Sequence, residues 1–339
     1  MTQDKTGVCI FTKEQLKRTT RCDKGVSRMG KITGICISEK RGIQKHYIEE
    51  ANIIKDWGIE GDAHGGKWHR QISILSAEKT NAFKEKGADI HPGSFGENLI
   101  IEGFDFALMP VGTRILIGEV VLEMTQIGKE CHNHCAIYKK MGDCIMPREG
   151  VFAEVIHGGH IKVGQKVACI LPEADRAYTA AVITLSDKGA AGKREDKSGP
   201  AIVEMLEERG YDIKETLLLA DEQKLLEKEL IRLSDQRQIN IIFTTGGTGF
   251  SERDRTPEAT IAVCDRMANG IAEAIRNYSM TITPRAMFSR AVSGIRKKTL
   301  IINLPGSPKA VRESLEFLLP NLEHGLGILR GTEGECARE

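Results

Sequence analysis

Three aspartates in the second half of the chain could hold a metal ion that carries phosphate groups. Each comes directly or shortly after an apolar run of the kind that forms a buried strand: Asp187, Asp221 and Asp254. Proteins commonly hold Mg²⁺ with one or two carboxylates together with the phosphates of a substrate. The residue types therefore indicate binding of a magnesium-bound nucleotide, provided that the fold brings the three side chains together.

Two of these aspartates also have a plain structural interpretation. Asp221 could cap a helix that begins at Glu222. Asp254 could pair with Arg253 or Arg255. The metal hypothesis rests on the convergence of all three carboxylates, because either of these two alone is explained without a ligand.

A glycine-rich segment, Gly246–Gly249, follows the apolar run 239–243. Glycine has no side chain, so the backbone N–H groups of such a segment can approach an anion closely. Two pairs nearby, Thr256-Pro257 and Ser307-Pro308, place a hydroxyl at an expected N-cap and proline at the first helical position. Helix N-termini attract phosphates, although the same pairs also begin ordinary helices.

The glycine-rich segment matches neither of two common phosphate-binding motifs. The chain contains neither the Gly-Lys-Ser/Thr ending of a P-loop nor a GxGxxG segment. The glycine-rich segment must therefore work differently from both of these phosphate-binding motifs.

The densest thiol and imidazole cluster lies in the first half, at Cys131-His132-Asn133-His134-Cys135, with Cys144 nine residues later. Cysteine and histidine are zinc ligands, but a second close ligand pair is missing. Buried structural cysteines are common. A third interpretation is a reactive thiolate, whose pKa Lys129 and the two histidines would lower and which could carry sulfur as a persulfide.

Two further segments of the first half combine glycine with polar side chains, Gly61–Gln71 and Gly93–Leu99. They could form tight turns around an anionic ligand, since the first contains His64, Lys67 and Arg70. Plain β-turns with exposed polar residues explain them nearly as well.

The elements that must position these residues differ between the two halves. In the second half, an apolar run, a loop and a helical pattern follow one another four times, and the runs lie at 180–185, 213–219, 239–243 and 299–304. This alternation predicts a mainly parallel, doubly wound α/β sheet with functional loops at the carboxyl ends of its strands. In the first half, short apolar runs bounded by turn residues predict a β-rich barrel or sandwich.

The change of pattern near Leu171–Arg176 places the boundary between two domains. We expect an N-terminal extension at 1–27, a β-rich domain at 28–171, a linker at 172–177, an α/β domain at 178–331 and a tail at 332–339.

The composition excludes several classes of protein. Lys and Arg number 48 against 47 Asp and Glu, so the net charge of +1 argues against nucleic-acid binding through bulk charge. No run approaches the roughly 18 apolar residues of a membrane span, and the N-terminal residues lack the apolar run of a secretory signal. Nine scattered cysteines favour reduced thiols, and we expect a cytoplasmic protein.

The second half resembles the molybdopterin adenylyltransferase family, which includes the gephyrin-type G domain, over about residues 178–331. Six ordered motifs carry the resemblance: Ser186-Asp187, Asp196–Pro200, Asp221–Gln223, Thr244–Gly249, Arg253–Thr260 and Asn303–Lys309. The resemblance implies a reaction of Mg-ATP with molybdopterin, in which the terminal phosphate of molybdopterin attacks the α-phosphorus and pyrophosphate leaves. It also implies a homo-oligomer, a trimer or larger.

The same resemblance implies roles for individual residues. Asp221 and Asp254 are the implied catalytic residues and metal ligands. The implied binding residues for the nucleotide, the pterin and their phosphates are Ser186, Asp187, Gly246, Gly247, Thr248, Gly249, Asn303, Pro305, Gly306 and Ser307.

The first half resembles the MOSC domain, named for the C-terminus of molybdenum cofactor sulfurases, over about residues 28–171. The matching pieces are His64–Leu75, Gly96–Leu99, Gly128–Cys131, Cys144–Gly150 and Gly158-Gly159. The family is β-rich and is associated with sulfur carriage and molybdenum-cofactor handling through one cysteine.

At the MOSC domain the resemblance implies Cys131 as the catalytic thiol, with Cys135 and Cys144 as alternatives. The implied ligands there are molybdenum or its cofactor, and pyridoxal phosphate. The implied partner is a molybdenum insertase or a sulfurtransferase.

Both resemblances point to molybdenum cofactor biosynthesis. Two other functions stay open from the sequence. One is a cofactor-binding carrier without turnover, which would release no pyrophosphate. The other is a redox or metal-binding protein centred on Cys131 and Cys135.

Overall fold

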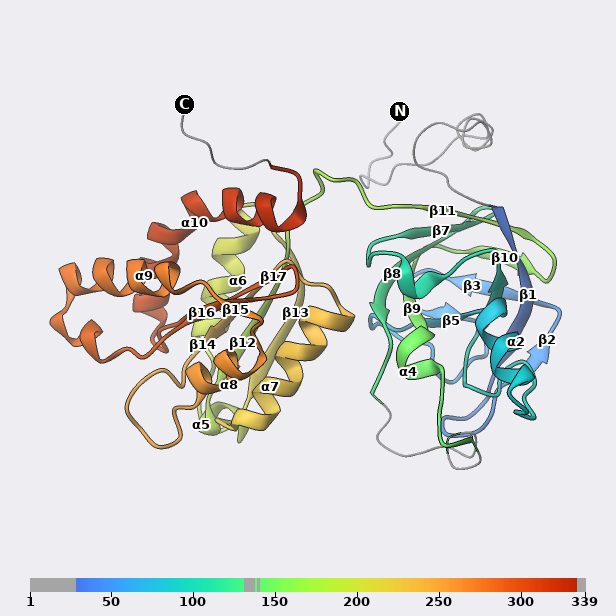
Figure 1. The fold of residues 1–339 in the computed structure, drawn as a ribbon, viewed down its shortest axis with the longest axis horizontal. Helices are drawn as coiled ribbons and strands as arrows, with labels where there is room; N and C mark the ends of the chain where they lie inside the picture. Colours follow the sequence, from blue (N-terminus) through green and yellow to red (C-terminus); the bar gives the residue numbers. More distant parts are fainter. Residues whose placement is uncertain (1–28, 131–137, 139–140, 334–339) are drawn as a thin grey trace. The chain divides into compact units, whose positions relative to one another are not determined.

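The structure is a computed structural model that describes residues 29–130, 138 and 141–333. The chain divides into two compact units, which meet in sequence between Pro172 and Glu173. Figure 1 shows a β-rich first unit and a second unit in which helices cover a sheet. In the part of the chain described, no helix is both long and apolar enough to cross a membrane.

The first unit is built on a closed barrel of seven strands (Figure 1). Around the barrel the order is β11-β7-β8-β9-β5-β6-β1, and β1 closes the ring by pairing with β11. All neighbours are antiparallel except β5 and β6, which run parallel. The strands are β1 (Met29–Ile37), β5 (Ile72–Ser76), β6 (Leu99–Glu102), β7 (Arg114–Ile117), β8 (Val120–Ile127), β9 (Val151–His157) and β11 (Lys166–Ile170).

Smaller elements complete this unit. A short strand pairs with the end of β1, and a separate three-stranded sheet has the order β10-β3-β4. Their bounds are β2 (His46–Ile48), β3 (Glu50–Ile54), β4 (Gly58–Ile59) and β10 (Gly159–Lys162). Among the described residues of this unit, the helices are α2 (Ala77–Glu85), η1 (Phe106–Leu108) and α4 (Met146–Glu149).

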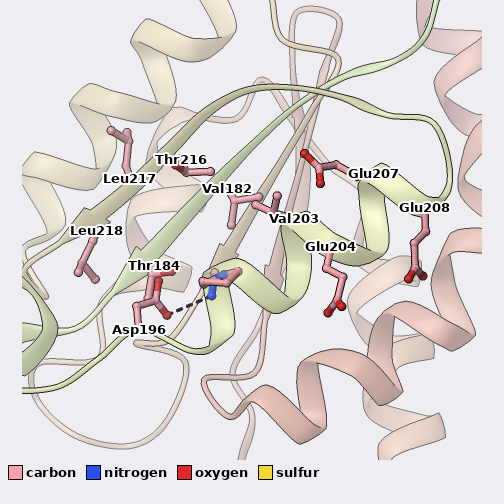
Figure 2. Close-up of a pocket in the computed structure, with 12 residues that line it drawn as sticks. Val182, Thr184, Asp196, Val203, Glu204, Glu207, Glu208, Thr216, Leu217 and Leu218 are labelled. Carbon is pink, nitrogen blue, oxygen red and sulfur yellow. Dashed lines mark hydrogen bonds between the residues drawn. The ribbon is translucent and has the colours of Figure 1, made fainter.

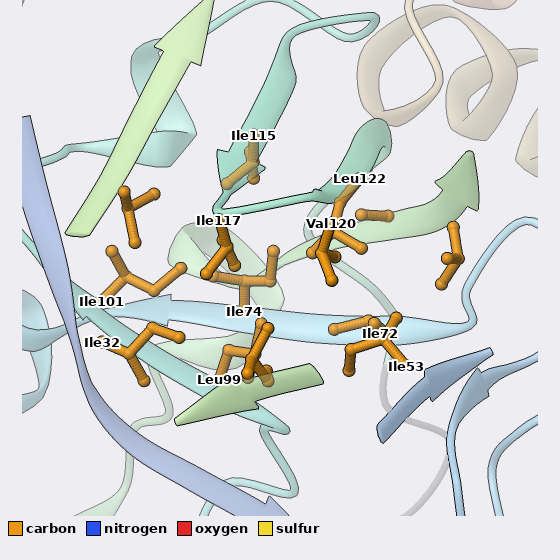
Figure 3. Packing of buried hydrophobic residues seen from close by; sticks show 14 of the residues in the cluster. Ile32, Ile53, Ile72, Ile74, Leu99, Ile101, Ile115, Ile117, Val120 and Leu122 are labelled. Carbon is orange, nitrogen blue, oxygen red and sulfur yellow. The ribbon is translucent and has the colours of Figure 1, made fainter. Parts of the chain in front are cut away.

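β-Branched and other aliphatic side chains fill the barrel, as small barrels require. Figure 3 shows Ile32, Ile74, Leu99 and Ile117, from four different strands, packed together inside it. All four are completely buried. Strand crossing is tight at Gly30, where a Cβ would lie 2.1 Å from the carbonyl oxygen of Glu102. The predicted β-rich barrel is confirmed.

The second unit contains a six-stranded sheet in the order β13-β12-β14-β17-β16-β15. The first four strands are parallel, and the last two are antiparallel to their neighbours. Their bounds are β12 (Thr179–Leu185), β13 (Asp212–Leu219), β14 (Ile241–Thr245), β15 (Arg266–Met267), β16 (Ser293–Arg296) and β17 (Thr299–Leu304).

Helices cover both faces of this sheet, each over its own apolar core. One core receives residues of α6, α9 and α10, and the other receives residues of α7 and α8. The helices are α5 (Asp187–Ala190), α6 (Ser198–Glu208), α7 (Gln223–Ile231), η2 (Arg232–Gln236), α8 (Thr256–Val263), α9 (Asn269–Ile282), η3 (Pro284–Phe288) and α10 (Pro308–Arg330). Central strands β12 and β14 are buried along their whole length, as expected between two helical layers. The predicted doubly wound α/β fold is confirmed.

The two units should unfold separately. Both tryptophans, Trp57 and Trp68, lie in the first unit, so their fluorescence reports on the barrel alone. Ile74→Ala should lower the barrel's free energy of unfolding by about 2–5 kcal/mol, because Ile74 is fully buried. Urea titration followed by tryptophan fluorescence would measure this.

The control is Leu315→Ala, which empties a fully buried position of the second unit. It should shift the helical circular dichroism and leave the tryptophan transition unchanged. An equal shift of both signals would mean that the chain unfolds as one body.

Candidate functional site

Two of the predicted aspartates lie against each other at neighbouring strand ends. Asp187 follows β12, and its backbone N–H donates to Asp221 Oδ2 at 2.9 Å. Asp221 follows β13, and its N–H donates to Asp187 Oδ1 at 3.0 Å. Because parallel strands end at the same edge of the sheet, this reciprocal pair joins the first two loops of that edge.

The glycine-rich segment after β14 brings the third carboxylate to the same place. A Cβ on Gly247 would lie 3.5 Å from Asp221 Oδ1, and a Cβ on Gly249 would lie 2.9 Å from Asp254 Oδ2. Both carboxylates therefore lie against the glycine-rich loop 246–249, at positions where glycine leaves room for them. Asp254 Oδ2 also accepts a hydrogen bond from Ser251 N at 2.9 Å.

The plain structural interpretations of these residues are wrong in their details. Helix α7 begins after Glu222, so Asp221 does not cap it. Arg253 pairs with Asp187 instead of Asp254, through Nε at 3.0 Å and Nη2 at 2.7 Å. Arg253 thus occupies both carboxylate oxygens of Asp187. The side chains of Asp221 and Asp254 have other partners.

The electrostatics of the aspartates differ accordingly. Burial raises the pKa of Asp221, and the charges of Asp187 and Asp254 raise it further. The hydrogen bond from Asp187 N and the charge of Arg253 lower this pKa, but the net shift is upward. Hydrogen bonds from Arg253 and from the Asp221 backbone hold the pKa of Asp187 below its usual range. Asp221 is therefore the carboxylate with the most to gain from a nearby cation.

The glycine loop has the conformation that its sequence demands. Gly246 and Gly247 have φ values of +94° and +63°, which favour glycine. A Cβ on Gly246 would lie 2.4 Å from the carbonyl oxygen of Leu185, so the loop passes directly over the end of β12.

Of the two residues expected to be helix N-caps, Ser307 is one and Thr256 is not. Ser307 is the N-cap of α10, and its Oγ accepts from Ala310 N at 3.2 Å. Thr256 is the first residue of α8 and not its N-cap, which is a correction. Its Oγ1 donates instead to the carbonyl oxygen of Gly246 at 2.9 Å, because the loop before the helix folds back toward it.

The remaining predicted binding residues surround this loop. Gly306 approaches it closely, since its Cβ would lie 3.4 Å from the Cα of Gly246. Pro305 accepts a hydrogen bond from Thr245 Oγ1 through its carbonyl oxygen at 2.6 Å. Thr248 is buried in the loop itself. Ser186 caps α5 by accepting from Gly189 N.

Asn303 is fully buried, and its side chain is used within the protein. Its Nδ2 donates to the hydroxyls of Thr244 and Thr260, both at 2.9 Å, and its Oδ1 accepts from Val292 N. These bonds join β14, β17 and α8, so its geometry is that of a positioning residue.

The sequence analysis did not identify Arg290, whose hydrogen bonds fix the loop between Thr248 and Asp254. Its backbone N donates to Thr248 O at 2.9 Å, and its Nε donates to Gly249 O at 2.7 Å. Its Nη2 reaches the carbonyl oxygen of Asp254, and its Nη1 pairs with Glu258. Because it lies 36 residues after Asp254, no local pattern could have identified it.

The donor set fits a hard cation that shares its ligands with phosphates. Among the described residues, no group of three or more His, Cys, Asp or Glu side chains is arranged to hold a metal ion. Asp221 and Asp254 offer two carboxylates, which is the usual protein share for Mg²⁺ bound to a nucleotide. When bound with ATP, Mg²⁺ would supply charge neutralisation at the phosphates.

The two glycine-containing segments of the barrel meet around a buried ion pair. Lys45 Nζ donates to both oxygens of Asp62, at 2.5 and 2.6 Å, and the two side chains are 2% and 0% exposed. Asn98 Nδ2 and Ser38 N also donate to this carboxylate. His64 Nδ1 lies 3.4 Å from Lys45 Nζ.

Burial alone would raise the pKa of Asp62, but its hydrogen bonds with His64, Lys45 and the Ser38 backbone hold that pKa far below the usual range. Burial lowers the pKa of Lys45, against its attraction to Asp62. The charges of this centre are thus compensated within the barrel.

The predicted thiol cluster falls outside the described residues, which include neither Cys131 nor Cys135. Cys144 is buried in a small apolar cluster with Phe95 and Phe152. Of the described cysteines, Cys36 is buried near Glu97, and burial first and this carboxylate second raise its pKa to about 12.

Comparison with known proteins finds relatives of both units. A family model described as a probable molybdopterin binding domain matches residues 181–324, and one described as a MOSC domain matches residues 60–168. A molybdopterin adenylyltransferase of Helicobacter pylori is 44% identical over 152 residues, which are 44% of this chain and 86% of the relative.

A molybdopterin adenylyltransferase of Escherichia coli K12 is 42% identical over 138 residues, covering 40% of this chain and 70% of the relative. The solved structure of a molybdopterin biosynthesis enzyme, MoaB, from Thermus thermophilus is 44% identical. It covers 45% of this chain and 97% of that one, with a TM-score of 0.44.

Removing Lys45 should destabilise the barrel strongly. Lys45→Ala leaves the buried Asp62 charge without its partner, and we expect a loss of about 3–5 kcal/mol in the free energy of unfolding. The control is Lys31→Ala, whose ion pair with Glu102 is half-exposed and should contribute at most about 1 kcal/mol. Urea titration with tryptophan fluorescence would compare them; equal losses would contradict this account.

Neutralising Asp221 should stabilise the second unit. Because its pKa is raised in the fold, the folded chain binds the proton more tightly, and stability falls as the pH rises through the raised value. Asp221→Asn should therefore raise Tm at pH 7 by a few degrees, and the gain should vanish below about pH 4. Circular dichroism melting at several pH values would measure it.

The control is Asp187→Asn, which loses the charge pair with Arg253 and should not raise Tm at pH 7. If Asp221→Asn lowered Tm, the charge at this position would be stabilising and the electrostatic account wrong.

Proposed function

The chain belongs to the molybdopterin adenylyltransferase family through its second unit and carries a MOSC domain in its first, and we propose that the second unit transfers AMP from Mg-ATP to the terminal phosphate of molybdopterin. The oxygen of that phosphate attacks the α-phosphorus, and pyrophosphate leaves. The single observation that carries the proposal is the convergence of Asp221 and Asp254 on the glycine-rich loop at the sheet edge.

The chain's own part in this reaction is to position two anionic substrates. The loop at Gly246 and Gly247 would meet the phosphates through its backbone. The N-terminus of α10 lies beside this loop, because Gly306 approaches Gly246 closely. Asp221 and Asp254 would hold the cation that accompanies the triphosphate. Arg253 ties Asp187 back, and Arg290 fixes the loop that bears Asp254.

Several finer assignments are part of the proposal. We propose that the cation is Mg²⁺, that the protein assembles into a trimer or a larger oligomer, and that it is located in the cytoplasm. For the barrel unit we propose sulfur carriage through Cys131, with molybdenum or its cofactor and pyridoxal phosphate as ligands and a molybdenum insertase or sulfurtransferase as partner. Family resemblance supports these assignments.

Loss of either carboxylate should abolish most turnover. Asp221→Asn and Asp254→Asn should each lower the rate of pyrophosphate release with Mg-ATP and molybdopterin by about 10²–10³-fold, the size of effect seen when one electrostatic stabiliser is removed. A coupled pyrophosphate assay would measure it.

The control is Asp212→Asn, which neutralises an aspartate at the opposite end of β13 and should leave the rate unchanged. Wild-type protein that binds molybdopterin but releases no pyrophosphate would instead support a carrier without turnover.

A further inference from the structure

A basic side chain beside Asp221 and Asp254 is held by an exposed ion pair. The guanidinium of Arg253 donates to both carboxylate oxygens of Asp187, from Nε at 3.0 Å and from Nη2 at 2.7 Å. The two side chains are 55% and 45% exposed. Ion pairs so open to water stabilise a protein little, so the guanidinium can leave Asp187 with little loss of stability.

Arg253 and Asp254 leave one tight turn in different directions. The N–H of Asp254 donates to Ser251 O at 3.0 Å, and Asp254 Oδ2 accepts from Ser251 N at 2.9 Å and lies against Gly249. Arg253 reaches from the same turn to Asp187, whose Oδ1 also accepts from the N–H of Asp221. The guanidinium therefore connects the loop that carries Asp254 to the pair formed by Asp187 and Asp221.

The positive charge of Arg253 acts on this edge of the sheet. Burial raises the pKa of Asp221, and the charge of Arg253 opposes that rise. The neighbouring Arg290 is used differently, because its guanidinium donates to the carbonyl oxygens of Gly249 and Asp254 and pairs with Glu258. Arg253 is thus the arginine whose partner is exposed and exchangeable.

A triphosphate needs positive charge at this edge. It remains anionic after one divalent cation has bound to it, so the three carboxylates repel it. Arginine binds a phosphate group through two parallel N–H···O bonds, as it binds a carboxylate. Arg253 already presents this pair of donors to Asp187.

The pocket beside helix α6 is unsuited to phosphates. It has a volume of about 590 Å³ and is lined by residues of β12, β13, α6 and the loop before α6, as Figure 2 shows. Its lining residues include no lysine, arginine or histidine, and its charged members are Asp196, Glu204, Glu207 and Glu208. A triphosphate would meet only repulsion there, whereas at the glycine-rich loop it meets Arg253.

We propose that Arg253 exchanges partners when the triphosphate binds: its guanidinium leaves Asp187 and donates to the phosphates of Mg-ATP. This inference rests on the proposed function, to which it adds a further substrate-binding residue. In the free chain, Asp187 competes with the triphosphate for the guanidinium. After the exchange, Asp187 still accepts from the N–H of Asp221.

The exchange and a purely structural role differ in the sign of one effect. If Arg253 only tied two loops together through Asp187, neutralising either side chain would break the tie and weaken triphosphate binding. If the guanidinium leaves Asp187, neutralising Asp187 releases it for the phosphates and tightens binding. Neutralising Arg253 still weakens binding, because the phosphates lose their partner.

Isothermal titration calorimetry of the full-length chain reads this sign without turnover. The probe is the α,β-methylene analogue of ATP with Mg²⁺. Arg253→Ala should weaken its binding about 10–100-fold, the effect of losing hydrogen bonds between charged groups. Asp187→Asn should tighten its binding about 3–5-fold, the effect of releasing an exposed bidentate ion pair.

Two matched controls lie in the same turn. Arg255→Ala removes the neighbouring arginine, whose Nε donates to Glu252 O. Glu252→Gln makes the same change of net charge as Asp187→Asn but frees no guanidinium. Each control should change binding less than about 2-fold. All four side chains are exposed, so the variants should fold, and circular dichroism melting verifies it.

Weaker binding by both Arg253→Ala and Asp187→Asn would overturn the exchange and make the ion pair a structural tie. Equal binding by Arg253→Ala and the unaltered chain would overturn it as well and leave the proposed function intact. If the unaltered chain bound no analogue at all, the proposed function would fail and this inference with it.

Discussion

Repulsion among three carboxylates at one sheet edge is the constraint around which the second unit is arranged. Asp187 and Asp221 each accept the other's backbone N–H, which fixes two like charges side by side. Arg253 neutralises Asp187, whereas Asp221 has its pKa raised by burial and by the neighbouring carboxylates. A fold keeps such an arrangement at a cost in stability, and active sites are where that cost is commonly found.

Much of this site could be predicted from the sequence, because it follows from the order of strands. The alternation of apolar runs and helical patterns predicts parallel strands, and parallel strands end at one edge, so Asp187 and Asp221 are expected at that edge. The structure adds that β12 and β13 are direct neighbours there. The glycines at 246 and 247 indicated a loop with little side-chain bulk after a buried strand, and the structure shows both at positive φ. These inferences needed residue type and chain order alone.

What the sequence could not supply were contacts between distant residues. Arg290 reaches back over 36 positions to Asp254, and Lys45 reaches Asp62 within a segment that looks like an ordinary turn. Thr256 resembled a helix cap, but the loop before it turns back and offers the Gly246 carbonyl instead. Propensity indicates which residues can cap or pair, whereas tertiary packing decides which of them do.

We propose that Asp221 and Asp254 together hold the cation of a bound triphosphate. A crystal structure of the chain with Mn²⁺ and a non-hydrolysable ATP analogue tests it directly, because the anomalous signal of manganese locates the ion. We predict one manganese peak bonded to both carboxylates and to phosphate oxygens, with the phosphates over Gly247. A peak at neither aspartate, with the analogue bound elsewhere, would contradict the account.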